Sequence, residues 1–267
     1  MSYRQFFGLK CEPFSPDLDP KRILQTEAIG AVDSRMHYVM RTGGILLVTG
    51  EVGAGKSTAL RWCTQQLHPS KHRVLWITAS SGSILEVYRQ LLAEFDIPTV
   101  ANSKAFLTRR IREQIVNVVN QLHQQILLVI DEASLLRIEV FAELHTLTQF
   151  EGDSKPWLPI VLVGQKNLAD NLLHRTVTPL ASRIIARTHI KEVDREQIER
   201  YLAHHLTIAG IKTNLYDASA ITAIHQGSGG LYRKANNLAR GALVAAAADR
   251  STHVTAEHVR QADSELI

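Results

Sequence analysis

The sequence predicts an α/β protein in which a parallel sheet lies between helices and a smaller, all-helical domain follows. Two observations support this prediction. Short, continuously apolar runs alternate with amphipathic helical patterns through about the first 190 residues, as in a parallel sheet covered on both faces. From Asp194 onward several helical patterns follow one another without a convincing strand. We therefore expect an N-terminal segment at 1–25, an α/β domain at 26–192 and a helical lid domain at 193–267.

The expected elements follow in order along the chain. Residues 1–25 are irregular and rich in proline and aromatic residues. Apolar runs predict strands at 45–49, 73–78, 126–130, 160–163 and 184–190. Helical periodicity predicts helices at about 27–41 and 104–123, and another one around Phe141, Leu144 and Leu147. The spacing of Ser83 and Glu86 predicts a capping box at the start of a further helix.

The first predicted strand runs into a glycine-rich loop and then a helix. The spacing from Gly50 to Ser57 fits G-x-x-x-x-G-K-[ST], a phosphate-binding loop. Glycines allow backbone turns in which successive N–H groups point at a polyphosphate, and the following helix presents its positive end to the same anion. Lys56 can reach the β and γ phosphates, and Ser57 can hold Mg²⁺. The residues expected to bind the nucleotide here are Gly50, Glu51, Val52, Gly53, Ala54, Gly55, Lys56, Ser57 and Thr58.

Two carboxylates end the third predicted strand. Asp131 and Glu132 follow an apolar run, which places them at the edge where open α/β sheets bind ligands. We expect Asp131 to act on Mg²⁺ and Glu132 to polarise the attacking water, since phosphoryl transfer needs positioning and charge neutralisation. We also expect the loop strand and the Asp131 strand to be neighbours. The pattern favours hydrolysis over nucleotide binding alone.

Three further polar residues are candidates for the same chemistry. Gln165, just after the fourth strand, stands where a γ-phosphate sensor would lie, and a turn residue that caps a helix is an equal alternative. Arg183, before the fifth strand, can act on the nucleotide of a neighbouring subunit as an arginine finger, with a surface arginine as the alternative. Arg233 begins a helix after Gly229-Gly230 and could fold back over the phosphates.

Composition limits the other possibilities. Apolar residues make up 45% of the chain and charged residues 21%, ordinary values for a globular protein. The N-terminus lacks the apolar core of a signal peptide, no run of 18 apolar residues occurs, and Cys11 and Cys63 form no metal or disulfide pattern. We therefore expect a cytoplasmic protein with no membrane partner.

The charge is distributed unevenly. The net charge is +4, and the residues from Lys191 onward contain nine basic and nine acidic side chains. The surplus therefore lies in the first 190 residues, where it permits an anionic partner such as nucleic acid.

Together these motifs resemble the AAA+ ATPases, and within them the ExeA/GspA group. The matching residues include Phe6-Phe7-Gly8-Leu9, Glu12-Pro13-Phe14-Ser15, the phosphate loop, Val163-Gly164-Gln165, Ser182-Arg183-Ile184 and the stretch from Tyr201 to Gly210. The family usually has proline before the lid arginine, where this chain has Tyr232. The resemblance implies an AAA+ core with a helical lid, ATP and Mg²⁺ as cofactors, and assembly into a homo-oligomeric ring or filament.

The resemblance also frames two functions. Secretion-associated members carry a membrane span and a peptidoglycan-binding region after the ATPase domain, whereas this sequence ends at Ile267 with neither. It is thus similar to the stand-alone target-selection ATPases of transposons, the TnsC, TniB and MuB kind. We expect an ATP-dependent regulator of transposition that binds double-stranded DNA and recruits or activates a transposase. The alternative is an ATPase that assembles a secretion or pilus complex without binding DNA. A metabolic nucleotide kinase would have no evident use for Arg183 or the lid.

A basic cluster on one predicted helix is the candidate DNA surface. It consists of Lys104, Arg109, Arg110 and Arg112. Phosphate contacts by such side chains would give a salt-sensitive affinity that does not depend on DNA sequence. A solvated helix face is at least as reasonable an interpretation. Lid residues Arg233, Lys234 and Arg240 form a weaker alternative surface.

Overall fold

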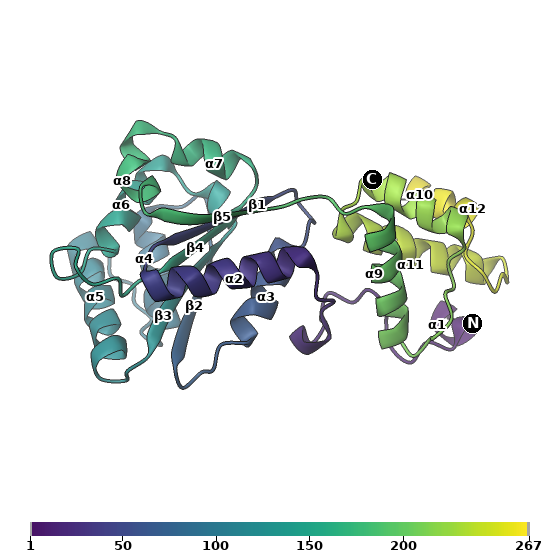
Figure 1. The fold of residues 1–267 in the computed structure, drawn as a ribbon, viewed down its shortest axis with the longest axis horizontal. Coiled ribbons are helices and arrows are strands. Elements are labelled where there is room, and N and C mark those ends of the chain that lie inside the picture. Colours follow the sequence, from purple (N-terminus) through teal and green to yellow (C-terminus); the bar gives the residue numbers. More distant parts are fainter. Residues whose placement is uncertain (1, 266–267) are drawn as a thin grey trace. The chain divides into compact units, whose positions relative to one another are not determined.

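The computed structural model describes residues 2–265, which form two compact units (Figure 1). The sheet unit consists of Thr26–Gly50 and Lys56–Ile190. The helical unit contains the N-terminal segment up to Gln25, the loop Glu51–Gly55 and the chain from Lys191 onward. By its contacts the N-terminal segment thus belongs with the C-terminal helices.

The sheet has five parallel strands in the order β2-β3-β4-β1-β5. Their bounds are β1 Ile45–Gly50, β2 His72–Thr78, β3 Gln125–Asp131, β4 Ile160–Gly164 and β5 Ile184–Ile190. All five predicted strands are present, and the predicted parallel α/β class is confirmed. The three central strands are almost entirely buried, whereas β2 and β5 expose part of their residues. Continuous apolar runs suit central strands because helices cover both of their faces.

One expectation about the sheet is wrong. β4 lies between β1 and β3, so the loop strand and the Asp131 strand are not neighbours. Apolar periodicity identifies a strand as buried but carries no information about which buried strand pairs with which. The two strands are therefore about 10 Å apart, twice the usual interstrand spacing.

Helices connect the strands of the sheet unit. They are α2 Glu27–Thr42, α3 Lys56–Gln65, α4 Ile84–Glu94, α5 Lys104–Asn120, α6 Ile138–Leu147, α7 Asn167–Leu172 and α8 Thr178–Ala181, with short 3₁₀ turns at Ala133–Leu135 and Arg175–Val177. The predicted capping box before α4 does not form. Ser83 makes no side-chain cap bond, because Glu86 instead accepts a hydrogen bond from the Ser80 hydroxyl at 2.9 Å.

The helical unit has a core of its own. Its elements are α1 Tyr3–Phe7, a 3₁₀ turn at Pro20–Arg22, α9 Arg195–Ile208, α10 Ala218–Ser228, α11 Tyr232–Ala248 and α12 Ala256–Ser264. Leu9 and Phe14 of the N-terminal segment are buried in this core. The Phe14 ring stacks on His205 with 5.2 Å between centroids. Burial lowers the pKa of His205 to about 4, so its imidazole is neutral at pH 7.

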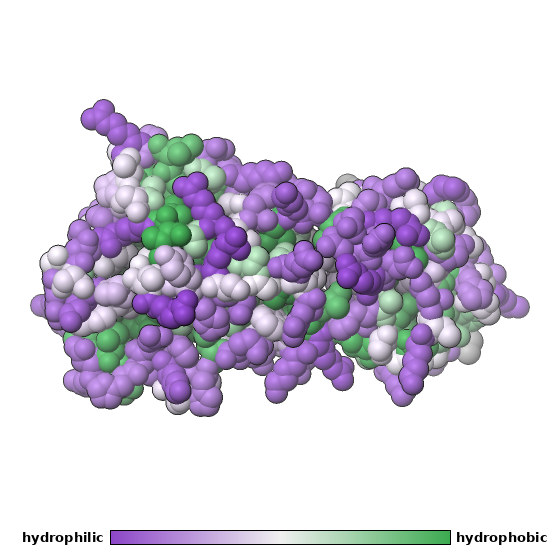
Figure 2. Space-filling view, in the orientation of Figure 1, coloured by the Kyte–Doolittle hydropathy of each residue, from purple (hydrophilic) through white to green (hydrophobic). Residues whose placement is uncertain are grey.

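The surface of the molecule is mainly hydrophilic in the face shown in Figure 2, with apolar surface gathered near α7 and α8. Leu173, at the end of α7, is 79% exposed. Among residues 2–265, no helix is both long enough and apolar enough to span a membrane.

Candidate functional site

The loop between β1 and α3 has the backbone that a phosphate-binding loop requires. Gly53 and Gly55 lie in the left-handed region, with φ of 85° and 95°, where a side chain would be strained. Gly50 has a different role from the predicted turn, because it is the last residue of β1. A Cβ there would lie 2.6 Å from the Ile190 carbonyl oxygen, so glycine is needed for the close approach of β5.

Lys56 begins helix α3 directly after this loop. Its side chain is only 7% exposed, and its Nζ donates a hydrogen bond to the Gly50 carbonyl at 3.0 Å. The ammonium therefore curls back over the loop rather than extending into solvent. Ser57 follows in the first turn of α3, whose N-terminal N–H groups and dipole favour an anion at this point.

Asp131 and Glu132 end β3 at the same edge of the sheet. Asp131 is 8% exposed, and its Oδ1 accepts the Glu132 backbone N–H at 2.9 Å. Glu132 has a left-handed backbone, with φ 53° and ψ 32°. Such a conformation is uncommon for a residue with a side chain and occurs often at functional sites. The turn directs the chain from the strand into the 3₁₀ turn at Ala133–Leu135.

Gln165 occupies the position between the loop strand and the Asp131 strand, because it follows β4. Its backbone N–H points to the Ser134 hydroxyl oxygen at 3.5 Å. A Cβ on Gly164 would come within 3.1 Å of Ser134, so glycine lets the turn after β3 pack against the end of β4. Helix α7 begins two residues later with Lys166 as its N-cap residue. The carboxyl edge thus presents Gly50, Gln165 and Asp131 in a row.

The residues at this edge fit a nucleotide with its divalent cation. A hydroxyl at Ser57 and a carboxylate at Asp131 are oxygen ligands of the kind that Mg²⁺ prefers, and Mg²⁺ usually completes its octahedron with phosphate oxygens and water. A set of three or more His, Cys, Asp and Glu side chains is not required for this. No such set that could hold a metal occurs within residues 2–265.

Arg183 lies at the opposite edge of the sheet. It precedes β5, and its carbonyl accepts the backbone N–H of Ile45, the first residue of β1. The length of β1 separates it from the phosphate loop, roughly 17 Å at the usual rise per residue, which exceeds the reach of an arginine side chain. Arg183 therefore cannot serve the loop of its own chain.

The guanidinium of Arg183 is engaged within its own chain. Its Nη2 donates to Asp153 Oδ1 at 2.5 Å, and its Nε donates to His145 Nδ1 at 3.2 Å. The hydrogen bond from Arg183 lowers the pKa of Asp153, and burial together with the Arg183 charge lowers the pKa of His145. The sequence analysis did not identify Asp153 and His145, because neither stands in a motif and only the fold brings them to Arg183.

Arg233 lies in the first turn of α11, in the helical unit. Its backbone N–H donates to the Gly53 carbonyl at 3.2 Å, and the glycine's missing Cβ would lie 2.8 Å from Arg233 Cβ. Helix α11 has no side-chain cap at Leu231. The loop carbonyl therefore satisfies one of the N–H groups that the start of a helix leaves open.

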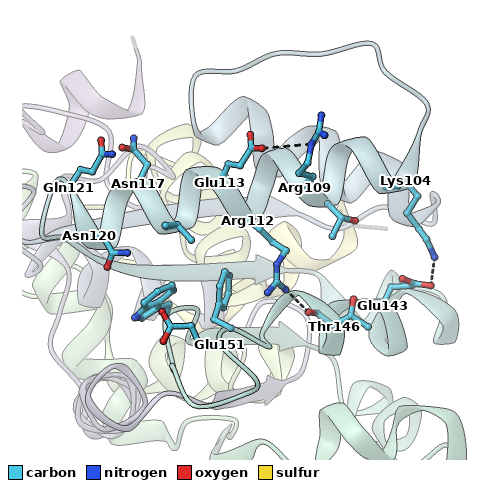
Figure 3. A pocket seen from close by; sticks show the side chains of 15 residues that line it. Lys104, Arg109, Arg112, Glu113, Asn117, Asn120, Gln121, Glu143, Thr146 and Glu151 are labelled. Atoms are coloured by element: carbon cyan, nitrogen blue, oxygen red, sulfur yellow. Dashed lines mark hydrogen bonds and ion pairs between the residues drawn. The ribbon is translucent and has the colours of Figure 1, made fainter.

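The four basic residues of α5 are not equivalent. Lys104 pairs with Glu143 at 2.7 Å, and Arg109 and Arg110 both pair with Glu113. Arg112 donates to the carbonyls of Thr146 and Gln149. Figure 3 shows Arg112 turned toward α6 while Arg109 points away from it. Arg109, 68% exposed, is the most accessible guanidinium of those in ion pairs on this helix.

Three of them, Lys104, Arg109 and Arg112, line a groove of about 980 Å³ between α5 and the end of α6 (Figure 3). Phe150 and Trp157 also line it, and Asn117, Asn120 and Gln121 lie at the end away from Lys104. Of the alternative lid surface, Arg240 is held by Glu12 at 3.0 Å and by the Phe14 carbonyl at 2.8 Å. That arginine therefore ties the N-terminal segment to α11.

Comparison with known proteins identifies the sheet unit. The model of the family described as "AAA domain" matches residues 39–172. General secretion pathway protein A of Aeromonas hydrophila is 33% identical over 94% of this chain and 46% of its own length. The chain thus spans about half the length of that relative. The ATP-dependent target DNA activator B of Escherichia phage Mu is 27% identical over 93% of this chain and 74% of its own length.

A solved structure shows the same fold. Cdc6p from Pyrobaculum aerophilum superposes with a TM-score of 0.75 at 18% identity, over 95% of this chain and 70% of that one. At this identity the likeness concerns the fold alone.

Proposed function

This chain belongs to the AAA domain family of ATPases, and we propose that it is an ATP-dependent DNA-binding regulator of transposition. In this proposal it selects target DNA and recruits or activates a transposase. The proposed activity uses ATP, so we place the protein in the cytoplasm.

The carboxyl edge of the sheet would bind and hydrolyse the nucleotide. The N–H groups of the Glu51–Gly55 loop and of the first turn of α3 would surround the phosphates. Lys56, whose Nζ now contacts the Gly50 carbonyl, would turn to the β and γ phosphates. The charged oxygens of the phosphates favour this movement, because ionised partners form stronger hydrogen bonds.

Hydrolysis would depend on the two carboxylates. Ser57 and Asp131 would hold Mg²⁺, which would neutralise charge on the phosphate oxygens. Glu132 would orient and polarise the attacking water. Because its backbone is left-handed, its side chain does not continue the alternating directions of the side chains of β3. Gln165, in the row between Gly50 and Asp131, would donate its amide to the γ-phosphate.

The two arginines would act from different places. Arg233 would contribute from α11, whose first turn is bonded to Gly53. Arg183 would stabilise transition-state charge on the nucleotide of a neighbouring copy, since it lies at the wrong edge to serve its own. This arrangement requires a homo-oligomer, either a ring or a filament.

The transposition proposal rests on one observation above the others. The similarity to the phage Mu target DNA activator extends over 93% of this chain and 74% of the relative, so both units correspond to most of that protein. The confinement of the basic surplus to the first 190 residues agrees with a DNA surface on the sheet unit.

A second candidate function has its own support. General secretion pathway protein A is the more identical of the two relatives, at 33%. An ATPase that assembles a secretion or pilus complex would hydrolyse ATP with the same residues and would not bind DNA. DNA affinity therefore separates the two functions, and ATPase activity does not.

The deciding experiment measures binding of the purified protein to labelled duplex DNA with ATP, a slowly hydrolysed ATP analogue, ADP or no nucleotide. A Lys56→Ala variant is the control, because it keeps every basic residue outside the loop. The transposition proposal predicts affinity with ATP or the analogue alone, lost in the variant. Intact ATPase activity without DNA binding under any nucleotide would favour the secretion function instead.

A further inference from the structure

A small hairpin links α6 to β4 beside the Arg183 side chain. Phe150 and Lys155 form an isolated antiparallel bridge that closes it. Its tip contains three consecutive residues with positive φ, Glu151 at 45°, Gly152 at 65° and Asp153 at 72°. Two of these are not glycine, so the backbone of the tip is unfavourable for its sequence.

The base of this 150–155 hairpin is fixed on both sides. Phe150 is 1% exposed, and the centre of its ring lies 5.4 Å from that of the Trp157 ring. The Arg112 guanidinium lies 4.5 Å from the centre of the Phe150 ring. On the other side Pro156 packs against Gly43 so closely that a Cβ on the glycine would lie 1.9 Å from it. Movement of the hairpin is thus restricted to its tip.

The tip itself has few contacts. Residues 151–156 are all exposed. Backbone bonds at 3.4 Å connect Ser154 to Glu151 and Lys155 to Phe150, and the exposed Ser154 hydroxyl also donates to the Glu151 carbonyl at 2.8 Å. Segments with little burial and long, exposed hydrogen bonds open at low free energy. The ion pair between Asp153 and Arg183 connects the tip to the rest of the sheet unit.

We propose that the tip of the 150–155 hairpin is a latch that holds Arg183 inactive until a neighbouring copy is bound. This inference rests on the proposed role of Arg183 as an arginine finger. A finger stabilises negative charge on the transferring phosphate, whereas the Asp153 carboxylate already neutralises its guanidinium. The Nε–H of Arg183 donates to His145 as well. Two nitrogen atoms of the guanidinium, Nη2 and Nε, are therefore engaged within the chain.

The strength of the latch suits such a role. The Asp153 side chain is 46% exposed, and exposed ion pairs contribute little to stability. Contact with a neighbour's nucleotide, which offers several charged oxygens, would therefore outcompete one solvated carboxylate. A cavity of about 280 Å³ borders the pair, lined by Thr42, Thr148 and Lys155 among others. It leaves room for the tip to shift without repacking the core.

The test compares ATPase rates over a range of protein concentrations. Asp153→Asn keeps the shape of the tip and removes its charge. Glu151→Gln is the matched control, since it removes a carboxylate from the same exposed tip and leaves the Asp153–Arg183 ion pair in place. We expect Asp153→Asn to raise the rate at low protein concentration by about two- to fivefold, in keeping with a weak exposed ion pair. We expect Glu151→Gln to match the wild type.

Arg183→Ala and the Asp153→Asn/Arg183→Ala double variant complete the design. If Asp153 acts by restraining Arg183, the double variant has the low rate of Arg183→Ala. A rate for Asp153→Asn that equals or falls below that of the wild type would overturn the latch. So would stimulation that persists without Arg183. A wild-type protein that binds nucleotide and never hydrolyses it would instead overturn the proposed function, and thermal unfolding of each variant shows whether it is folded.

Discussion

The two edges of the sheet differ in how they hold their polar groups. At the carboxyl edge, Lys56 and Asp131 are at most 8% exposed and are supported by buried strands. At the amino edge, the Arg183 side chain is 23% exposed, and its carboxylate partner stands on an exposed hairpin tip. A group that binds the chain's own nucleotide benefits from a fixed position, because preorganised dipoles need not rearrange during the reaction. A group that must reach another subunit needs freedom to change partners.

Under the proposed function, one copy of the chain cannot form a complete active site. The phosphate loop and Arg183 are separated by the length of β1, so the same strand that presents the loop keeps the arginine away from it. Under the proposed function, the parallel topology would therefore couple hydrolysis to assembly.

The largest effect should come from the carboxyl edge. We expect Lys56→Ala to abolish nucleotide binding, and Glu132→Gln to keep binding while lowering kcat by about 100-fold or more, as for loss of a general base. Glu139→Gln, an exposed carboxylate on α6, is the control and should retain activity. Binding is measured by a fluorescent nucleotide and hydrolysis by phosphate release. Normal turnover by Glu132→Gln would remove this residue from the mechanism.

Substitution of Arg183 at the amino edge should lower kcat nearly as much, though only in the assembled oligomer. We expect Arg183→Ala to bind nucleotide normally and to lose about 100-fold or more in kcat, as when an arginine finger is removed. Arg187→Ala, an exposed arginine on β5, is the matched control.

Mixtures of two inactive variants test whether the two edges act together across a subunit interface. Arg183→Ala retains an intact loop, and Lys56→Ala retains an intact arginine. Mixed assemblies should therefore recover part of the activity, because some interfaces combine both. Failure of every mixture to recover activity, with both variants folded and assembling, would contradict a site divided between subunits.

A smaller effect is expected on DNA affinity. Arg109 is exposed, pairs with Glu113 and lies over the Phe106 ring. Arg112 instead donates to the carbonyls of Thr146 and Gln149 and lies over the Phe150 ring of the 150–155 hairpin. Under the proposed function, Arg109→Ala should weaken binding severalfold and reduce the salt slope by about one. Arg41→Ala, an exposed arginine on α2, serves as the control in a filter-binding titration over salt. Equal salt slopes for the two variants would exclude Arg109 as a phosphate contact.

The smallest effect concerns pH at the amino edge. The pKa of His145 is lowered in the folded state by burial and by Arg183, so the unfolded chain binds this proton more readily. The contribution of neutral His145 to stability is therefore present above about pH 6.5, the ordinary pKa, and is lost as the pH falls. For this partly exposed group we expect less than about 1 kcal/mol. Urea unfolding at pH 8 and 5.5 should show a larger decrease for the wild type than for His145→Gln.

Several parts of the fold could be predicted because their causes are local. The five strands are runs of apolar residues, and the loop at Gly53 and Gly55 is specified by glycines at a fixed spacing. The failures concern the choice of partner. Glu86 does not complete the capping box of α4, because it accepts a hydrogen bond from Ser80, six residues earlier. The position of β4 between β1 and β3 depends on segments far apart in the chain. A spacing rule cannot represent competition between partners that the chain brings together only after folding.

The sequence by itself determined the class of protein, the phosphate loop and the carboxylates at the end of β3, since each is written within a few consecutive residues. The tertiary structure decided which charges remain accessible and which are already paired. Arg112 and Arg240 look like Arg109 in sequence, yet packing commits them to Phe150 and Glu12. It also placed Arg183 beside Asp153 and His145, residues 30 and 38 positions away. The physical reason is that electrostatic partners are set by distance in space, which only the folded sheet establishes.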